Sequence, residues 1–170
     1  MYIDRQHWEL VVLDGEGRNS ITGDFDGDGQ TEIVSDRRWY RPATFERGDI
    51  EPNLALRCVG ATAGDVDGDG LPEVIGATRR DADGAEYYSL YWYEPGASLS
   101  QPWRAHGICE ERIGQPHDVV VADVDGDGQN EVVVVRMYIA TPSVTIYKPG
   151  ADITQPWQET VVQAGTSGDG

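Results

Sequence analysis

The sequence predicts an all-β protein, a β-propeller of four-stranded blades, and three observations predict it. An acidic stretch occurs three times, as GDFDGDGQTEIV (23–34), GDVDGDGLPEVI (64–75) and ADVDGDGQNEVV (122–133). Short runs rich in Val and Ile, bounded by Gly, Pro and Asp, surround each copy, and such runs are typical of strands. No segment keeps a 3.6-residue apolar period over the length of a helix. Repeated four-stranded units of about 40–60 residues are typical of propellers, and a solenoid is the main alternative.

Two further landmarks follow the acidic stretch and confirm that the chain is repetitive. One is WYRP (39–42), WYEPG (92–96) and IYKPG (146–150), and the other is SQPW (100–103) and TQPW (154–157). The first and second acidic stretches begin 41 residues apart, and the second and third begin 58 residues apart. The difference comes from the residues between the landmarks. The second repeat carries TRRDADGAEYYS (78–89), where the first has almost nothing, so we expect this insertion to be specialised.

Each repeat is expected to contain four strands. In the third repeat the expected strands are 118–123, 131–137, 143–149 and 157–163. We divide residues 1–170 into an outer strand of a preceding blade and three blades, at 1–17, 18–60, 61–114 and 115–165. Three blades and a surplus strand cannot close a ring of about four to eight blades. We therefore expect either an excerpt of a larger propeller or a ring completed by further copies.

Composition limits the classes of partner. The chain has 170 residues and a net charge of −17, and twelve of its thirty acidic residues lie in the three acidic stretches. This local acidity argues against a nucleic-acid partner. No apolar stretch approaches the roughly 20 residues of a membrane span, and the N-terminus MYIDRQHWEL does not read as a signal peptide. Cys58 and Cys109 fall on predicted outer strands of neighbouring repeats, so we expect both to be unpaired.

The acidic stretches predict metal-binding loops. Asp at loop positions 1, 3 and 5, a carbonyl at 7 and Glu at 9 supply the hard oxygens that Ca²⁺ prefers. An acidic turn without metal is the alternative, but the mutual repulsion of four converging carboxylates would then cost several kcal/mol. The Glu at position 9 and the flanking strands distinguish the loop from an EF-hand. The predicted ligands of about three Ca²⁺ ions are Asp24, Asp26, Asp28, Gln30 and Glu32; Asp65, Asp67, Asp69, Leu71 and Glu73; and Asp123, Asp125, Asp127, Gln129 and Glu131.

The pattern D-x-D-x-D-G-x-x-E between two strands, recurring at blade spacing over roughly residues 7–163, resembles the FG-GAP and VCBS-type repeats. Such repeats build the propeller of integrin α subunits and occur in lectins, rhamnogalacturonan lyases and aldos-2-ulose dehydratases. The resemblance implies Ca²⁺ in the loop between the first two strands of each blade. The segment WRAHGICEERIGQPHDVVVADVDGDG (103–128) looks most like the carbohydrate-active branch. One fold hosts many functions, so the resemblance does not fix one.

The face opposite the acidic loops carries the candidate ligand-binding residues. Arginine recurs just after the second strand, and arginine forks suit carboxylates and sugar hydroxyls. The alternative is that these arginines pair with Asp36, Asp81 and Asp83 for solubility. His117 is a candidate base or metal ligand, or a hydrogen-bonded structural residue. The candidates are Arg37, Arg38, Arg79, Arg80, Arg136 and His117.

Aromatic residues divide into two predicted groups. Trp8, Trp103 and Trp157 occupy the same place in successive fourth strands, so we expect them to pack in the core. The better candidates for stacking on a sugar lie near the insertion and are Tyr87, Tyr88 and Trp92. His7 and His106 are expected at the surface.

These patterns favour a calcium-binding propeller module that binds a carbohydrate or a protein. The alternatives are a part of a carbohydrate-active lyase or dehydratase, and a purely structural repeat module, so the sequence leaves catalysis open. Further blades or another chain are possible partners in completing the ring. Because extracellular calcium is millimolar, we expect an extracellular or cell-surface location.

Overall fold

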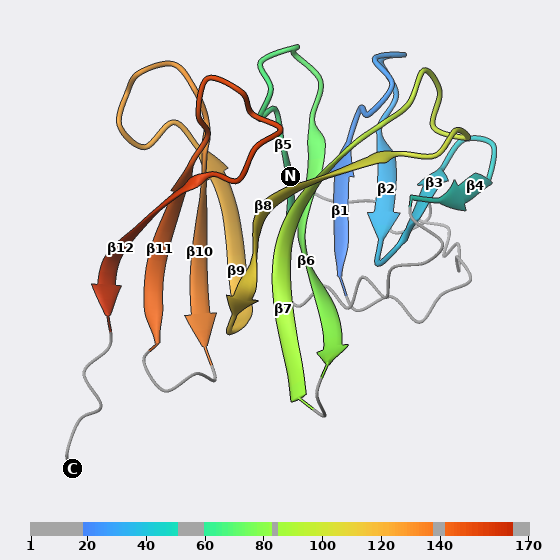
Figure 1. Cartoon of the computed structure of the whole chain (residues 1–170). Coiled ribbons are helices and arrows are strands. Elements are labelled where there is room, and N and C mark those ends of the chain that lie inside the picture. Colours follow the sequence, from blue (N-terminus) through green and yellow to red (C-terminus); the bar gives the residue numbers. More distant parts are fainter. Residues whose placement is uncertain (1–18, 51–59, 83–84, 138–141, 165–170) are drawn as a thin grey trace, which may run out of the picture.

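The computed structural model describes residues 19–50, 60–82, 85–137 and 142–164, in which the regular structure consists of strands that form three antiparallel sheets of four. Figure 1 shows the sheets side by side. The first contains β1 (Ser20–Gly23), β2 (Glu32–Ser35), β3 (Arg38–Arg41) and β4 (Glu46–Asp49); the second β5 (Ala61–Gly64), β6 (Glu73–Ala82), β7 (Ala85–Glu94) and β8 (Arg104–Ile113); and the third β9 (Gln115–Ala122), β10 (Glu131–Met137), β11 (Ser143–Lys148) and β12 (Gln158–Ala164).

The all-β class and the four-stranded repeat are confirmed. In each sheet the strand order follows the chain, and the four strands predicted for the third repeat correspond to β9–β12. The first strands bring the sheets together, since β1 lies against β5 and β5 lies against β9. The described residues form no closed ring, so the propeller and its number of blades stay predictions. Nor do the described residues include a helix of the length and apolarity that a membrane crossing requires.

The insertion of the second repeat lengthens a hairpin. β6 and β7 have 10 residues each and pair from Val74 with Tyr93 to Ala82 with Ala85. The prediction that Tyr88 and Trp92 offer stacking surfaces is wrong, because they are only 7% and 2% exposed.

Trp92 is covered by a histidine of the neighbouring strand. The rings of Trp92 and His106 stack with their centroids 4.0 Å apart. His106, expected at the surface, is partly buried, and its side chain is 16% exposed. Adjacent strands in a sheet bring side chains of one face together. Here the His106 ring on β8 covers the Trp92 ring on β7.

The apolar core lies between the sheets. One cluster joins the first and second sheets around Phe25, Trp39 and Tyr93, and another joins the second and third around Leu90 and Tyr147. Burying a large apolar side chain contributes about 1.5–3 kcal/mol. These clusters therefore hold the sheets to one another as well as stabilising each sheet.

The two described fourth-strand tryptophans are buried, as predicted, and Trp8 lies outside the described residues. The indole N–H of Trp103 donates to the Leu99 carbonyl at 3.2 Å, and that of Trp157 donates to the Ile153 carbonyl at 2.9 Å. The same four-residue bridge explains why SQPW and TQPW recur. A buried indole N–H needs such a partner.

The second and third sheets also meet through backbone. The Trp157 N–H donates to the Ile108 carbonyl at 3.0 Å. Where the first strands β5 and β9 meet, a Cβ added to Gly64 would lie 2.7 Å from the Val121 side chain, so this position admits only glycine without movement. Cys109 is buried and forms no disulfide within the described residues, and Cys58 lies outside them.

Candidate metal centres

The three acidic loops lie at the same edge of the row of sheets, each between the first and second strands of its sheet (Figure 1). We call residues 24–32, 65–73 and 123–131 loops 1, 2 and 3. Glycines occupy positions 4 and 6 of every loop, and their φ angles run from 71° to 92°. Only glycine adopts this region readily, so the loops turn tightly and their aspartates converge.

A buried glutamate anchors each loop at position 9, where the second strand begins. Its side chain is essentially inaccessible, with exposures of 0%, 1% and 1%. One carboxylate oxygen accepts a hydrogen bond from the backbone N–H at position 2. The three bonds join Phe25 to Glu32 at 3.2 Å, Val66 to Glu73 at 2.8 Å and Val124 to Glu131 at 2.8 Å.

The loop backbone holds the aspartates in place. The carboxylate at position 1 accepts from the N–H at position 6, at 2.9, 3.0 and 3.0 Å in the three loops. The carboxylate at position 5 accepts from the N–H at position 7, at 2.8, 2.8 and 2.9 Å. Such short side-chain-to-backbone bonds favour turns over regular structure. The inward orientation of these side chains is therefore built into the backbone.

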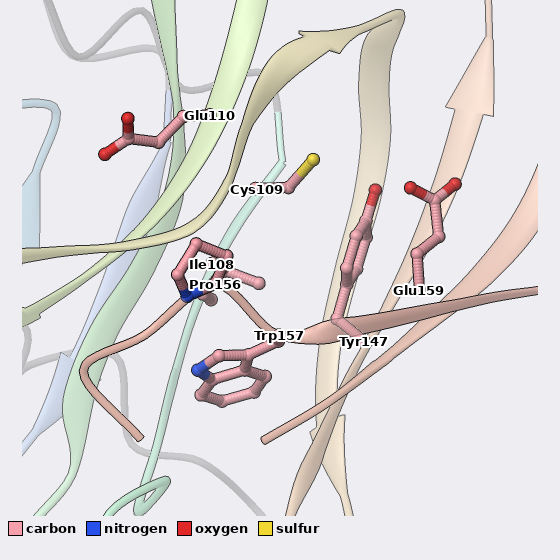
Figure 2. A pocket seen from close by; sticks show the side chains of 7 residues that line it. All are labelled: Ile108, Cys109, Glu110, Tyr147, Pro156, Trp157 and Glu159. Carbon is pink, nitrogen blue, oxygen red and sulfur yellow. The ribbon is translucent and has the colours of Figure 1, made fainter. Parts of the chain in front are cut away.

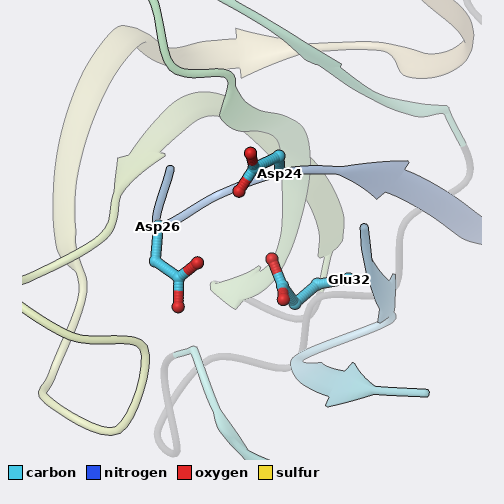
Figure 3. A group of neighbouring side chains, drawn as sticks. All are labelled: Asp24, Asp26 and Glu32. Carbon is cyan, nitrogen blue, oxygen red and sulfur yellow. The ribbon is translucent and has the colours of Figure 1, made fainter. Parts of the chain in front are cut away.

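Three groups of carboxylates result, and in each the ligand atoms lie within 4.8 Å of one another. Figure 3 shows the first group, in which the three carboxylates face a common centre. The groups are Asp24, Asp26 and Glu32; Asp65, Asp67 and Glu73; and Asp123, Asp125 and Asp127. The predicted ligands Asp28, Asp69 and Glu131 are outside these groups, and the carbonyls of Gln30, Leu71 and Gln129 stay predicted ligands.

The donor set fits a hard divalent cation. Oδ1 of Asp24 is buried and accepts no hydrogen bond from the described residues. An unpartnered buried carboxylate oxygen is costly, and a cation would supply the missing partner. Several carboxylate oxygens of this kind suit Ca²⁺ better than metals that prefer nitrogen or sulfur.

Burial and mutual repulsion make the charged form of these carboxylates unfavourable when no cation is bound. Desolvation, reinforced by repulsion from Asp67, Asp69 and Asp65, raises the pKa of Glu73 to about 8. Desolvation likewise raises the pKa of Glu32 and of Asp67. A carboxyl group that is partly protonated near neutral pH gains strongly from a positive charge beside it.

Two cationic side chains that sequence reasoning missed enter loops 1 and 3. Arg41 pairs with Asp26, lies 3.3 Å from Glu32, and is shared with Glu46 at 2.9 Å. Lys148 pairs with three carboxylates of loop 3: Asp125, Asp127 at 2.6 Å and Glu131 at 3.5 Å.

Lys148 also changes the ionisation of its partners. Its hydrogen bond lowers the pKa of Asp127, and the bonds to Asp125 and Asp127 raise the pKa of Lys148 itself. The signal was present in the sequence, because Arg41 and Lys148 are the residues between Tyr and Pro in the landmarks WYRP and IYKPG.

The residues predicted for ligand binding are distributed over separate sheets. Arg38 makes an ion pair with Asp49 at 3.2 Å, and the Arg37 carbonyl accepts the Ile50 N–H at 2.7 Å. Arg79 lies in β6, and the side chain of Arg80 falls outside the described part of the chain.

Arg136 and His117, the other two predicted residues, lie in the third sheet. Arg136 contacts Glu159 and the Tyr147 hydroxyl, and lies 5.6 Å from the centre of the Tyr147 ring. His117 Nδ1 is 2.9 Å from Asp118, and both side chains are exposed. Arg38 and Arg136 thus pair with acidic residues, as the alternative interpretation of the arginines predicted. Their partners are Asp49 and Glu159, which are not the acids named there.

A cavity of about 410 Å³ lies between the second and third sheets. Figure 2 shows the Tyr147 hydroxyl and the Glu159 carboxylate pointing to the same side of it. Burial, with a further contribution from Cys109, raises the pKa of Tyr147, which therefore stays a neutral phenol. The lining residues are Ile108, Cys109, Glu110, Tyr147, Pro156, Trp157 and Glu159.

Comparison with known proteins supports the repeat. Residues 65–134 match the family model of the FG-GAP-like repeat, a stretch that begins at the first aspartate of loop 2 and ends in β10. Loops 2 and 3 therefore both lie in the matched region, and this part of the chain is similar to an FG-GAP-like repeat. No curated protein matches the chain.

Proposed function

We propose that this chain is a calcium-binding module of an extracellular β-propeller that serves to bind a carbohydrate or protein ligand. The observation that carries the proposal is the threefold loop, in which a buried glutamate and backbone N–H groups aim carboxylates at one centre. Ca²⁺ accepts such oxygen ligands in flexible geometry. Its role is structural, because each loop joins the first two strands of its sheet.

Calcium would offset the repulsion within each loop. Loop 2 holds Asp65, Asp67 and Glu73 with ligand atoms within 4.8 Å of one another. A ligand that binds only the folded state at 100 times its Kd stabilises that state by about 2.7 kcal/mol. Three such sites would make folding strongly dependent on calcium, as suits an extracellular protein in millimolar calcium.

The propeller part of the proposal rests on how neighbouring sheets meet. At loop position 2, Phe25 and Val66 are buried, with 0% and 2% exposure, whereas Val124 is 48% exposed. Val120 of β9 is also exposed, at 53%. The described part of the third sheet thus has an uncovered apolar patch at the position that another sheet covers in the first two. A further blade, in this chain or another, is its proposed occupant.

The cavity between the second and third sheets is the proposed ligand site. Ligand pockets are typically about 300–1,000 Å³ and combine apolar walls with a few polar groups. This cavity has a volume of about 410 Å³ and presents Glu110, Glu159 and the Tyr147 hydroxyl beside Trp157. Carboxylates and a phenol can exchange hydrogen bonds with sugar hydroxyls. Arg136 contacts both Glu159 and the Tyr147 hydroxyl and holds them in position.

Two measurements test the proposal. Calcium titration by calorimetry, after treatment with a chelator, should show binding, and thermal melting should rise with calcium and fall in EGTA. Absence of calcium binding would overturn the calcium part. For the ligand site, a glycan array should yield a ligand that Glu159→Gln weakens, whereas Asp118→Asn, which changes an exposed carboxylate outside the cavity, should leave its binding unchanged.

A further inference from the structure

The third strand of each sheet places one charged residue beside the buried glutamate of its loop. Strand pairing sets this position, since Ile33 pairs with Tyr40, Val74 with Tyr93 and Val132 with Tyr147. The residue before Ile33, Val74 or Val132 is the glutamate, and the residue after each tyrosine therefore lies opposite it. These three residues are Arg41, Glu94 and Lys148.

The charge at this position differs between the loops. In loops 1 and 3 the residue is a cation that reaches the carboxylates: Arg41 is 3.3 Å from Glu32, and Lys148 is 2.6 Å from Asp127. In loop 2 the residue is Glu94, whose negative charge adds to the repulsion felt by Asp67. Loops 1 and 3 thus each combine four acidic residues with one cation. In loop 2, Glu94 adds a fifth acidic residue to the four of the loop.

From this difference we infer that the residue after the third-strand tyrosine ranks the three calcium sites, and that loop 2 binds Ca²⁺ most tightly. The inference rests on the proposed calcium function. Arg41 and Lys148 act as built-in counter-ions that partly neutralise loops 1 and 3 without calcium. Ca²⁺ must displace or approach a positive charge there, whereas in loop 2 it meets an additional carboxylate.

The surroundings of Glu94 are consistent with this role. The carboxylate lies 3.3 Å from His106 Nε2 and 3.7 Å from Arg104, and both residues belong to β8. Arg104 is 68% exposed, and solvent therefore screens its charge. Because this partner cation is screened, Glu94 remains a source of negative potential for the site.

Loop 2 also opens into space that the ion can use. A cavity of about 290 Å³ lies between loops 2 and 3 and is lined by Asp65 and Asp67 together with Asn130. Asn130 of loop 3 donates to the Asp65 carbonyl at 2.6 Å, which fixes loop 2 from the neighbouring sheet. Room for water beside two carboxylates suits Ca²⁺, which commonly keeps water among its six to eight oxygen ligands.

Calorimetric titration of the full chain with CaCl₂, after removal of metal, tests the ranking. We expect one tight site and two weaker ones. Asp65→Ala should remove the tight site and leave the weaker pair, whereas Asp123→Ala should leave the tight site in place. Glu94→Lys should weaken the tight site by at least about tenfold, because it changes by two units the charge at the position opposite Glu73. Glu94→Gln should give an intermediate effect.

The reciprocal variant and a control complete the experiment. Lys148→Glu should tighten the site of loop 3 by at least about tenfold. Asp118→Lys makes the same change in net charge as Glu94→Lys, but at an exposed position, and should not alter the tight site because salt screens it. Circular dichroism and melting in EGTA check that each variant folds. The fold tolerates a lysine at this position, since Lys148 occupies the equivalent place in the third sheet.

Three outcomes separate the inference from the proposed function. If neither the parent chain nor any variant binds calcium, the proposed function is wrong and the ranking with it. If all three sites bind with equal affinity, or the tight site survives Glu94→Lys and Asp65→Ala, the ranking alone is wrong. If Asp118→Lys weakens the tight site as much as Glu94→Lys does, net charge, and not the residue beside the buried glutamate, sets the affinity.

Discussion

Phe25 of loop 1 and Trp103, the residue before β8, are packed across two sheets, with ring centroids 5.7 Å apart and planes inclined at 56°. Both side chains are buried, at 0% and 4% exposure. Tilted aromatic pairs of this kind contribute about 0.5–1.5 kcal/mol beyond the area they bury. The acidic loop of one sheet is therefore also a packing element for the next, which joins the metal site to the core.

Phe25→Ala should lower the free energy of unfolding by about 3–5 kcal/mol, because it leaves a cavity between two sheets. Val124→Ala is the matched control at the same loop position, and its expected effect is within about 0.5 kcal/mol, since Val124 is 48% exposed. Denaturant unfolding in saturating calcium measures both. Equal losses in the two variants would show that position 2 of loop 1 does not join the sheets.

Gly64→Ala should destabilise the chain by at least about 1 kcal/mol. The added Cβ would lie 2.7 Å from the Val121 side chain, so β5 and β9 would have to separate. Gly150→Ala is the control, because a Cβ there meets nothing within 4 Å. Thermal melting of both variants in calcium compares them, and an unchanged midpoint for Gly64→Ala would argue against close approach of β5 and β9.

Asp65→Ala should lower the melting temperature in calcium and reduce the difference between calcium and EGTA. The Asp65 carboxylate accepts from the N–H groups of Gly68 and Gly70, at 2.7 and 3.0 Å, so its removal also loosens the loop. Comparison with the same variant in EGTA separates the two effects. A melting temperature that falls equally in both solutions would indicate a purely structural role for Asp65.

Much of the fold could be predicted from the sequence because its determinants are local. β-Branched runs set the strands, and glycines with positive φ set the loops, so the four strands and the acidic loop were recoverable from one repeat. The cations that enter loops 1 and 3 were not predicted, because Arg41 and Lys148 reach the carboxylates only through the pairing of second and third strands. Register of this kind depends on tertiary packing.

The burial of Trp92 was missed for a related reason. Its neighbour His106 belongs to β8 and is separated from it by the connection between two strands, so an aromatic residue beside an insertion looked available for a ligand. The cavity beside Trp157 combines residues of β8 with residues of β11 and β12, which come from different repeats. No pattern within one repeat predicts a cavity between two.

The stability of the calcium-free chain should fall as pH rises through the range set by Glu73. Its pKa is about 8 in the folded chain, against an ordinary value of 4.5. Unfolding between these values releases a proton, so the contribution to stability is fully present below about pH 4.5 and is lost as pH approaches 8. Glu32 and Asp67, whose pKa values are also raised, act in the same direction.

Melting temperatures of the parent chain and Glu73→Gln, measured in EGTA from about pH 5 to 8.5, test this linkage. The parent should lose stability over this range, and the variant should lose less because glutamine carries no charge at any pH. In saturating calcium the loss should shrink, since the ion requires the carboxylate and its binding near neutral pH releases the proton. Equal slopes for the parent and Glu73→Gln in EGTA would mean that the Glu73 carboxyl does not titrate in this range.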